Sequence, residues 1–242
     1  MLPLLTSGAS RLGLRLDARQ LERFERYYHL LAEAGGRIGL TTALSYEQVQ
    51  RRHFLESAAL AVALREEGLL PTEGQNHLID VGTGGGFPSV PMKILLPQLP
   101  LTLVEATAKK ATFLHRLVKE LDLGDVQILP GRAETLARET PHREAYQLAV
   151  SKAVAPLPTL LELTLPFLRV GGVLAAPKGS GVDEELARSG LALALLGGVL
   201  EKVRPLAIPY AKHPQTMVLV RKQSPTPPRY PRRPGIPKKR PL

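Results

Sequence analysis

Residues 1–70 carry apolar side chains at helical spacing, so we expect this part of the chain to form an N-terminal helical extension. Asp17 and Gln20 form the signature of a capping box, which marks the start of a helix. We expect Gly35-Gly36 to end this helix, because glycine is a poor helix former. The predicted apolar stripe of the helix comprises Leu21, Phe24, Tyr28 and Leu31.

A second helix is predicted from Ser45 to Gly68. Ser45 with Gln48 repeats the start signal, and apolar positions continue at helical spacing behind it. Arg51, Arg52 and His53 stand together in this helix. We favour a solvated basic face with a histidine at the edge of the core, and we keep His53 as a candidate RNA contact.

From residue 77 onward the pattern changes to short apolar runs that alternate with helical segments, which predicts an α/β fold with a parallel sheet. The last two apolar runs lie too close together for a crossover helix, so we expect an antiparallel hairpin at one edge. The predicted strands lie near 77–81, 101–105, 126–130, 147–151, 171–176, 200–208 and 217–220. The predicted helices lie near 88–96, 109–121, 157–168 and 183–196.

The first of these strands runs directly into a cluster of glycines. Residues 78–81 read Leu-Ile-Asp-Val, and Gly82, Gly84 and Gly86 follow before Phe87 and Pro88. Glycines at such a turn let a ligand approach the backbone, and proline is favoured in the first turn of the following helix. This segment is therefore the first candidate for a binding site.

The spacing of the glycines narrows the ligand. A dinucleotide fingerprint needs G-x-G-x-x-G, but its third glycine position is occupied here by Phe87, and a phosphate loop ending in G-K-[ST] is absent. Asp80 followed by G-x-G-x-G resembles motif I of the Rossmann-like S-adenosylmethionine (SAM) methyltransferases. A glycine-rich turn without a ligand is the alternative.

Glu105 ends the second predicted strand about 20 residues after the glycines, the distance at which an acidic side chain binds ribose hydroxyls in such folds. A carboxylate suits this role because it accepts two hydroxyl hydrogen bonds at once. The alternative is a carboxylate that only pairs with Lys109 and Lys110 at the start of the next helix.

Composition limits the class of protein. The 242 residues contain no cysteine, which excludes disulfides and thiolate zinc sites, and 44% are apolar, enough for a core. No apolar stretch is long enough to span a membrane, so we expect a cytoplasmic protein with no membrane partner. The formal net charge of +10 predicts a polyanionic partner, and nucleic acid is favoured. We expect a monomer.

The last segment, residues 224–242, is rich in proline and basic residues and contains no acidic residue. We expect it to run as an extended, polyproline-like chain and to leave cofactor binding intact when it is removed. Its candidate RNA contacts are Arg229, Tyr230, Arg232 and Arg233, with tyrosine stacking on an unpaired base. A disordered, solubilising tail or packing over the domain are the alternatives.

Four stretches together resemble one family, the bacterial small-subunit (16S) ribosomal RNA guanine-N7 methyltransferases, also called glucose-inhibited division protein B. They are residues 52–57 (Arg-His-Phe-Leu-Glu-Ser), 80–88 (Asp-Val-Gly-Thr-Gly-Gly-Gly-Phe-Pro), 131–134 (Gly-Arg-Ala-Glu) and 226–235 of the tail. The resemblance implies a Rossmann-like methyltransferase core over residues 71–223, between the helical extension and the tail. It also implies SAM as cofactor and small-subunit ribosomal RNA, or an assembling small subunit, as partner.

The resemblance implies that the cofactor contacts of this family correspond to eight positions of the chain. The spacing of the glycine motif adds Gly84 as a ninth candidate. Two positions depart from the family pattern: Lys152 stands where arginine is usual, and Gly39-Leu40-Thr41 stands where the family has Asn-Leu-Thr. The eight positions are Gly82, Phe87, Glu105, Ala106, Thr107, Ala133, Glu134 and Lys152.

The reaction is narrowed by what the chain lacks. Methylation at C5 of a pyrimidine needs a thiolate, and exocyclic amine methylation uses an Asn/Asp-Pro-Pro-Tyr/Phe motif, whereas residues 151–156 read Ser-Lys-Ala-Val-Ala-Pro. Guanine N7 carries a lone pair and no proton, so alignment suffices and we assign no catalytic side chain and no metal ligand. Methylation of a small molecule, or RNA binding without catalysis beside a relic cofactor pocket, are the alternative functions.

Overall fold

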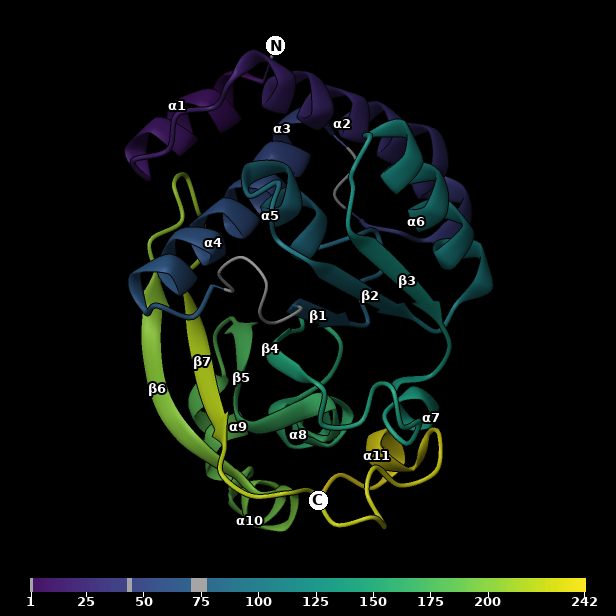
Figure 1. Cartoon of the computed structure of the whole chain (residues 1–242). Helices are drawn as coiled ribbons and strands as arrows, with labels where there is room; N and C mark the ends of the chain where they lie inside the picture. The colour runs from purple at the N-terminus through teal and green to yellow at the C-terminus, as the bar shows by residue number, and fades with distance from the viewer. Residues whose placement is uncertain (1, 43–44, 71–77) are drawn as a thin grey trace.

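The computed structural model describes residues 2–42, 45–70 and 78–242. A seven-stranded sheet runs through the centre of the molecule in the order β3-β2-β1-β4-β5-β7-β6 (Figure 1). Neighbouring strands from β3 to β5 are parallel, and β7 is antiparallel to both β5 and β6. The strands are β1 Leu78–Val81, β2 Leu101–Glu105, β3 Val126–Pro130, β4 Tyr146–Val150, β5 Leu168–Lys178, β6 Gly198–Leu206 and β7 Gln215–Lys222.

This arrangement confirms the predicted fold of five parallel strands with an antiparallel edge hairpin. Each strand lies within a few residues of its prediction, although residue 77 of the first one and residues 71–77 at the predicted domain boundary lie outside the described residues. β1 and β2 are buried along their whole length, as their nearly unbroken apolar runs predict.

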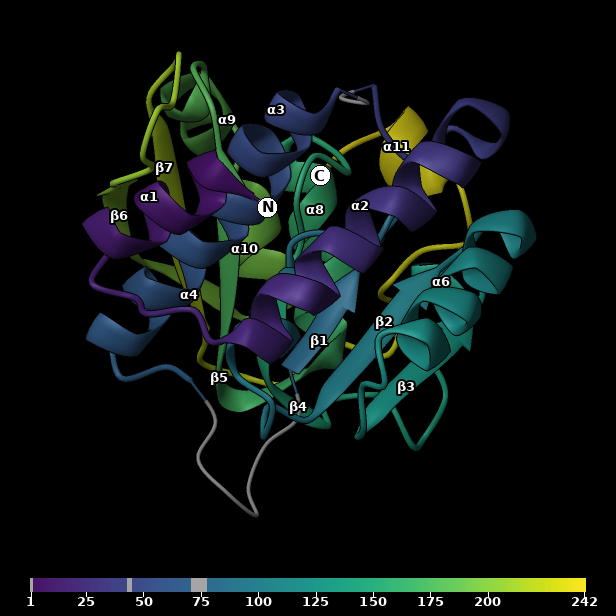
Figure 2. The same ribbon diagram turned by 90° about the horizontal axis from the view of Figure 1, so that it is seen from above.

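Two helical layers cover the sheet, as Figures 1 and 2 show. One layer holds the N-terminal helices together with α5 and α6, and its core joins residues such as Phe24 and Phe54 to Leu103 of β2. It comprises α1 Pro3–Arg11, α2 Ala18–Ile38, α3 Tyr46–Val49, the π-helix η1 Gln50–Leu55, α4 Glu56–Glu66, α5 Ser89–Leu95 and α6 Ala108–Glu120. The opposite layer comprises α7 Ala133–Leu136, α8 Leu157–Thr164, the 3-10 turn η2 Leu165–Phe167, α9 Val182–Ala187, α10 Gly190–Leu196 and α11 Ile236–Lys239.

The N-terminal layer departs from the prediction in two places. The capping box of Asp17 and Gln20 is present, but α2 continues through Gly35-Gly36 and ends at Ile38, where Gly39 adopts the left-handed cap conformation with φ 62°. The second helix is capped by Ser45 as predicted, but its middle is the π-helix η1. A π turn offers backbone carbonyls to other partners, and the Arg52 carbonyl accepts from the Lys152 ammonium at 2.9 Å.

Three predictions for the later segments are also corrected. The predicted helix 183–196 is two helices, α9 and α10, separated near the buried Ser189, whose hydroxyl donates to the Glu185 carbonyl at 2.7 Å. α5 begins at Ser89, and Pro88 is its N-cap residue. The C-terminal segment is not a free extended chain: residues 224–242, which we call the C-terminal strap, pack against α7 and α8 and include the short helix α11.

Candidate cofactor-binding site

The glycine loop, residues 82–86, leaves the carboxyl end of β1 and is tied to β2, because the Gly82 and Thr83 N–H groups both donate to the Val104 carbonyl at 2.9 and 3.2 Å. Gly82, Gly84 and Gly86 all adopt positive φ, at 78°, 58° and 100°. These angles favour glycine over any residue with a Cβ.

The surroundings of the three glycines differ. A Cβ on Gly82 would lie 2.6 Å from Val154, and one on Gly86 would lie 2.6 Å from the Tyr27 hydroxyl. A Cβ on Gly84 would meet no described atom within 4 Å. Gly82 and Gly86 are therefore required by the packing of the chain itself, and Gly84 is the glycine that leaves room for a ligand.

Glu105 lies beside Gly84 at the carboxyl end of β2. One carboxylate oxygen accepts from the Gly84 N–H at 3.0 Å and the other from the Thr107 N–H at 2.7 Å, and the residue is only 6% exposed. Each oxygen retains a second lone pair for a ligand hydroxyl. Ala106 and Thr107 are exposed next to it. The structure thus brings the predicted ribose carboxylate and the glycine loop together.

Asp80, the acidic residue of β1, lies fully buried behind the loop. Its Oδ2 accepts from the Thr83 hydroxyl at 2.8 Å and from the Ser89 hydroxyl, so it joins the glycine loop to the start of α5. Its Oδ1 is buried without a hydrogen-bond partner among the described residues. Burial raises the pKa of Asp80 to about 7, although the hydrogen bonds from Ser89 and Thr83 oppose the rise.

An aromatic stack fixes the far side of the loop. The Phe87 ring lies between Tyr27, with ring centroids 5.3 Å apart and 7° between planes, and His53, at 4.1 Å and 14°. The Tyr27 hydroxyl donates to the Gly85 carbonyl at 2.7 Å, and His53 Nε2 lies 2.6 Å from the Thr41 hydroxyl. Phe87 is 7% exposed, so its side chain belongs to the stack.

One residue of this stack differs from the expectation, and another agrees with it. Tyr27 is fully buried and Tyr28 is only half-buried, so Tyr27 replaces Tyr28 in the core stripe of α2. Burial, followed by the charges of Lys152 and Arg52, lowers the pKa of His53 to about 3. The stacked His53 agrees with the favoured interpretation of a histidine at the edge of the core, and its RNA contact stays a prediction.

Lys152 follows β4 and connects the sheet to the N-terminal layer. Its ammonium pairs with the Glu56 carboxylate and donates to the Arg52 carbonyl, while Gln215 donates to the other Glu56 oxygen at 2.7 Å. The preceding Ser151 donates to the Val81 carbonyl at 2.7 Å, which joins the ends of β4 and β1. The lysine charge is therefore balanced by a carboxylate of the chain itself.

Ala133 and Glu134 form the start of α7 and complete the arrangement. The Gly131 N–H donates to the Glu105 carbonyl at 2.9 Å, so the approach to α7 lies against the end of β2. Both residues are buried, and Glu134 Oε1 accepts from the Gly235 N–H of the C-terminal strap at 2.9 Å. The predicted cofactor residues after β1, β2 and β3 therefore share one edge of the sheet.

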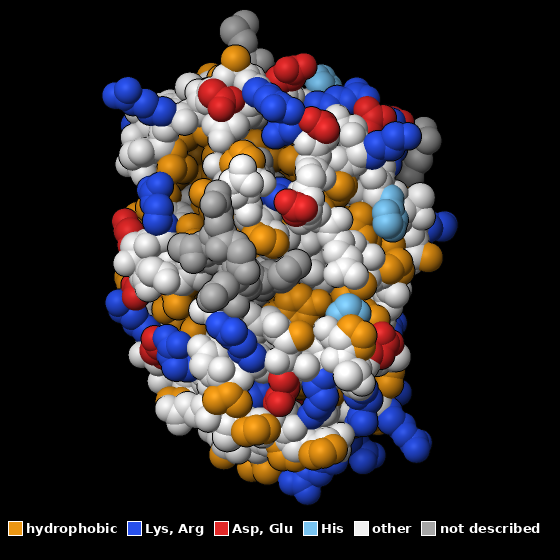
Figure 3. Space-filling view, in the orientation of Figure 1, with side chains coloured by type: hydrophobic (Ala, Val, Ile, Leu, Met, Phe, Trp, Pro, Cys, Tyr) orange, Lys and Arg blue, Asp and Glu red, His pale blue; other side chains and the backbone are white. Residues whose placement is uncertain are grey.

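The strap residues predicted to bind RNA divide into two groups. Tyr230 is 7% exposed within the core beside α7, and Arg232 pairs with the fully buried Glu162 at 2.6 Å, so these two face the protein. Arg229 and Arg233 are exposed. Figure 3 shows Lys and Arg side chains gathered at the lower right, over the region of α11.

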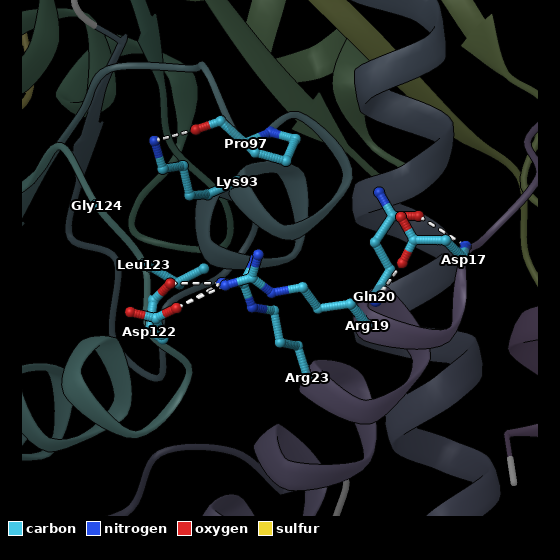
Figure 4. Close-up of a pocket in the computed structure, with 9 residues that line it drawn as sticks. All are labelled: Asp17, Arg19, Gln20, Arg23, Lys93, Pro97, Asp122, Leu123 and Gly124. Atoms are coloured by element: carbon cyan, nitrogen blue, oxygen red, sulfur yellow. Dashed lines mark hydrogen bonds and ion pairs between the residues drawn. The ribbon is translucent and has the colours of Figure 1, made fainter.

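A separate cavity of about 270 Å³ lies at the opposite, amino-terminal ends of β2 and β3 (Figure 4). Its basic side chains already have partners: Arg19 and Arg23 bind Asp122, and the buried Lys93 donates to the carbonyls of Pro97 and Leu99. This cavity is remote from the glycine loop, and we assign it no role.

No described group of histidine and acidic residues has the arrangement of a metal site, and none of the described helices is both long and apolar enough to cross a membrane. Sequence reasoning missed Tyr27, Glu56 and Ser89 as parts of the site. Only the helical spacing of Phe24, Tyr27 and Leu31 could have indicated Tyr27.

Comparison with known proteins shows the family of this chain. The family model of rRNA small subunit methyltransferase G (GidB) matches residues 20–213. Proteins named ribosomal RNA small subunit methyltransferase G from Roseiflexus castenholzii and Dehalococcoides mccartyi are each 44% identical, over 97% and 98% of both chains. The fold is similar to that of a mutant of MtNAS solved in complex with S-adenosylmethionine, with a TM-score of 0.54, 14% identity and coverage of 92% of this chain and 78% of that one. The chain belongs to the family of rRNA small subunit methyltransferase G.

Proposed function

We propose that this protein transfers the methyl group of SAM to N7 of a guanine in small-subunit ribosomal RNA. Family membership carries the class of reaction, the cofactor and the RNA. The main support for the cofactor site in this chain is the position of the Glu105 carboxylate. It accepts hydrogen bonds from the Gly84 and Thr107 N–H groups and lies beside the open space at Gly84.

The residues present fit SAM. The Glu105 oxygens have free lone pairs for the two ribose hydroxyls, and Gly84 leaves room for the ligand to approach the backbone. Gly82 and Phe87 offer backbone atoms at the two ends of the loop, and Ala106 and Thr107 lie beside the ribose position. Ala133 and Glu134 offer backbone atoms on the side where the adenine would lie.

The bound cofactor would supply a methyl group on a positively charged sulfur; on transfer to the guanine N7 lone pair, the methyl–sulfur bond would break and the sulfur would leave as a neutral thioether. N7 carries no proton, so the chain needs only to align the two groups and to exclude other orientations. Lys152 lies at the end of β4, where the methyl group would be, and its pairing with Glu56 leaves no net charge to repel the cationic methylated guanine. This pairing suits a reaction whose product gains a positive charge.

The outer face of the C-terminal strap fits the RNA phosphates. The strap contains no acidic residue, and the cations on its exposed face are Arg229, Arg233, Lys238, Lys239 and Arg240. Tyr230 and Arg232 are not part of this surface, because they face α7 and α8. Each contact between a cation and a phosphate strengthens RNA binding, and this contribution becomes smaller as the salt concentration rises.

Binding of SAM to the unmodified chain and to Glu105→Gln, measured by calorimetry, tests the cofactor site. The amide keeps the shape but loses charge-assisted acceptance, so the affinity should decrease by about 1.5–3 kcal/mol. NAD should not bind. Binding of NAD without SAM, or equal SAM affinity of the two folded proteins, would contradict the assignment.

The RNA surface is tested by neutralising Lys238 and Lys239 to glutamine. Affinity for small-subunit RNA should decrease, and the slope of log affinity against log salt should become shallower by about 0.7–0.9 per lost phosphate contact. The matched control neutralises two exposed cations of the opposite layer, Arg15 and Lys119. If neutralising the control pair lowers RNA affinity and the salt slope as much as neutralising Lys238 and Lys239, the strap is not the RNA contact.

A further inference from the structure

The C-terminal strap is held by polar contacts along the segment that contains α7. The Arg138 guanidinium, just after α7, donates to the carbonyls of Pro228, Arg229 and Pro231. Arg143 donates to the carbonyls of Thr226, Pro227 and Tyr230. The strap therefore presents its backbone oxygens to two arginines that follow α7.

The far half of the strap is anchored to α8. Arg232 forms a forked ion pair with Glu162, whose carboxylate is fully buried and also accepts the Arg232 backbone N–H at 2.7 Å. Thr159 donates to the Pro237 carbonyl at 3.1 Å. A buried carboxylate needs such a partner, because an unpaired buried charge is costly. These contacts fix the position of Gly235 between the two anchors.

Gly235 is the point at which the strap contacts the candidate cofactor site. Its N–H donates to Glu134 Oε1 at 2.9 Å, and Glu134 is 7% exposed. Gly131 binds the backbone of Glu105, so α7 lies between the strap and the ribose carboxylate. α7 packs against α8 on one side, and the strap binds it through Glu134 at the edge of the sheet that ends in β3.

We infer that the C-terminal strap is part of the cofactor site: the Gly235–Glu134 hydrogen bond positions α7 against the adenine side of bound SAM. The inference rests on the proposed function, and it makes Gly235 and Glu134 positioning residues. It also replaces the expectation that removal of the tail leaves cofactor binding intact.

A double-mutant cycle tests the inference. Its two changes are truncation after Arg233, which removes Gly235 but keeps the Arg232–Glu162 pair, and Glu134→Ala. SAM affinity is measured by calorimetry for both single variants and their combination, with melting temperatures to establish folding. Truncation after Arg240, which retains Gly235, is the matched control.

Each single change should weaken SAM binding about tenfold, as expected for loss of a hydrogen bond to a charged group. The combined variant should be no weaker than the weaker single variant, because both changes remove the same contact. The control truncation should bind within about twofold of the unmodified chain. Should truncation after Arg233 prevent folding, Gly235→Pro in the full chain replaces it, because proline has no backbone N–H to donate to Glu134.

Three outcomes would overturn the inference. Unchanged affinity after truncation would mean that the strap does not position α7. Losses that multiply in the combined variant would mean that Glu134 contacts the cofactor independently of the strap. Failure of the unmodified chain to bind SAM would overturn the proposed cofactor, and the positioning role with it.

Discussion

The hydroxyl of Tyr27 in α2 donates a hydrogen bond to the carbonyl oxygen of Gly85 at 2.7 Å. The two residues are 58 positions apart. The sequence pattern places Tyr27 in the N-terminal helical extension and Gly85 in the α/β core. The Tyr27 ring also stacks on Phe87, which immediately follows the loop. The N-terminal helices are therefore a structural support of the glycine loop as well as a cover for the sheet.

Tyr27→Phe should decrease the free energy of unfolding by about 1–3 kcal/mol, because the Gly85 carbonyl loses its buried donor while the ring stack remains. SAM affinity should decrease as well, since the loop is no longer held at Gly85. Chemical denaturation and calorimetry measure the two effects. Tyr28→Phe, one position along the same helix, is the matched control and should change neither, because the half-buried Tyr28 contributes ring contacts to His29 and Tyr46 that phenylalanine retains.

The glycine loop allows a second pair of variants. Gly84→Ala should weaken SAM binding strongly and destabilise the fold by about 1–2 kcal/mol, the cost of a left-handed residue. Gly86→Ala carries this cost and also places its Cβ 2.6 Å from the Tyr27 hydroxyl and 2.9 Å from Val90. It should therefore destabilise the fold more than Gly84→Ala. Equal melting temperatures for the two variants would contradict the packing role of Gly86, and unchanged SAM affinity of Gly84→Ala would contradict the assignment of Gly84 as the ligand-facing glycine.

Asp80 predicts a pH dependence of stability. Its folded-state pKa is raised from 3.8 to about 7 by burial, so the folded protein keeps a proton that the unfolded chain has lost. The resulting contribution to stability is complete below about pH 4 and disappears as the pH rises to about 7, with a limiting slope of about 1.4 kcal/mol per pH unit. The difference in unfolding free energy between the unmodified chain and Asp80→Asn should therefore decrease from about pH 4 to about pH 7 and level off above. A difference independent of pH would show that Asp80 is ionised throughout; His53 is present in both proteins and cancels.

The central architecture could be predicted because each of its signals is local. The apolar runs of the strands, the capping box of Asp17 and the glycines after β1 are each contained within a few residues, and the structure has all of them in place. Glu105 could be located as well, since its distance from the glycines follows from the length of one strand–helix unit.

The remaining features depend on partners that are distant in the sequence. In the π-helix η1, the Arg52 carbonyl accepts a hydrogen bond from Lys152, 100 residues away. The strap is held by the ion pair of Arg232 with Glu162, 70 residues away. The proline- and arginine-rich composition of the strap predicts a disordered segment in solvent. Instead, the strap packs against the protein, because Arg232 pairs with the buried carboxylate of Glu162 on α8. α2 likewise continues through Gly35-Gly36, although glycine is a poor helix former.

A methyl-transfer assay is the direct test of the proposed reaction. The protein is incubated with SAM labelled in the methyl group and with naked small-subunit RNA, small subunits or whole ribosomes, and the modified nucleoside is then identified. We expect label in 7-methylguanosine at one position of the small-subunit RNA, with transfer reduced in Glu105→Gln. Label on another atom or on no RNA substrate, by a protein that binds SAM, would contradict the proposed reaction.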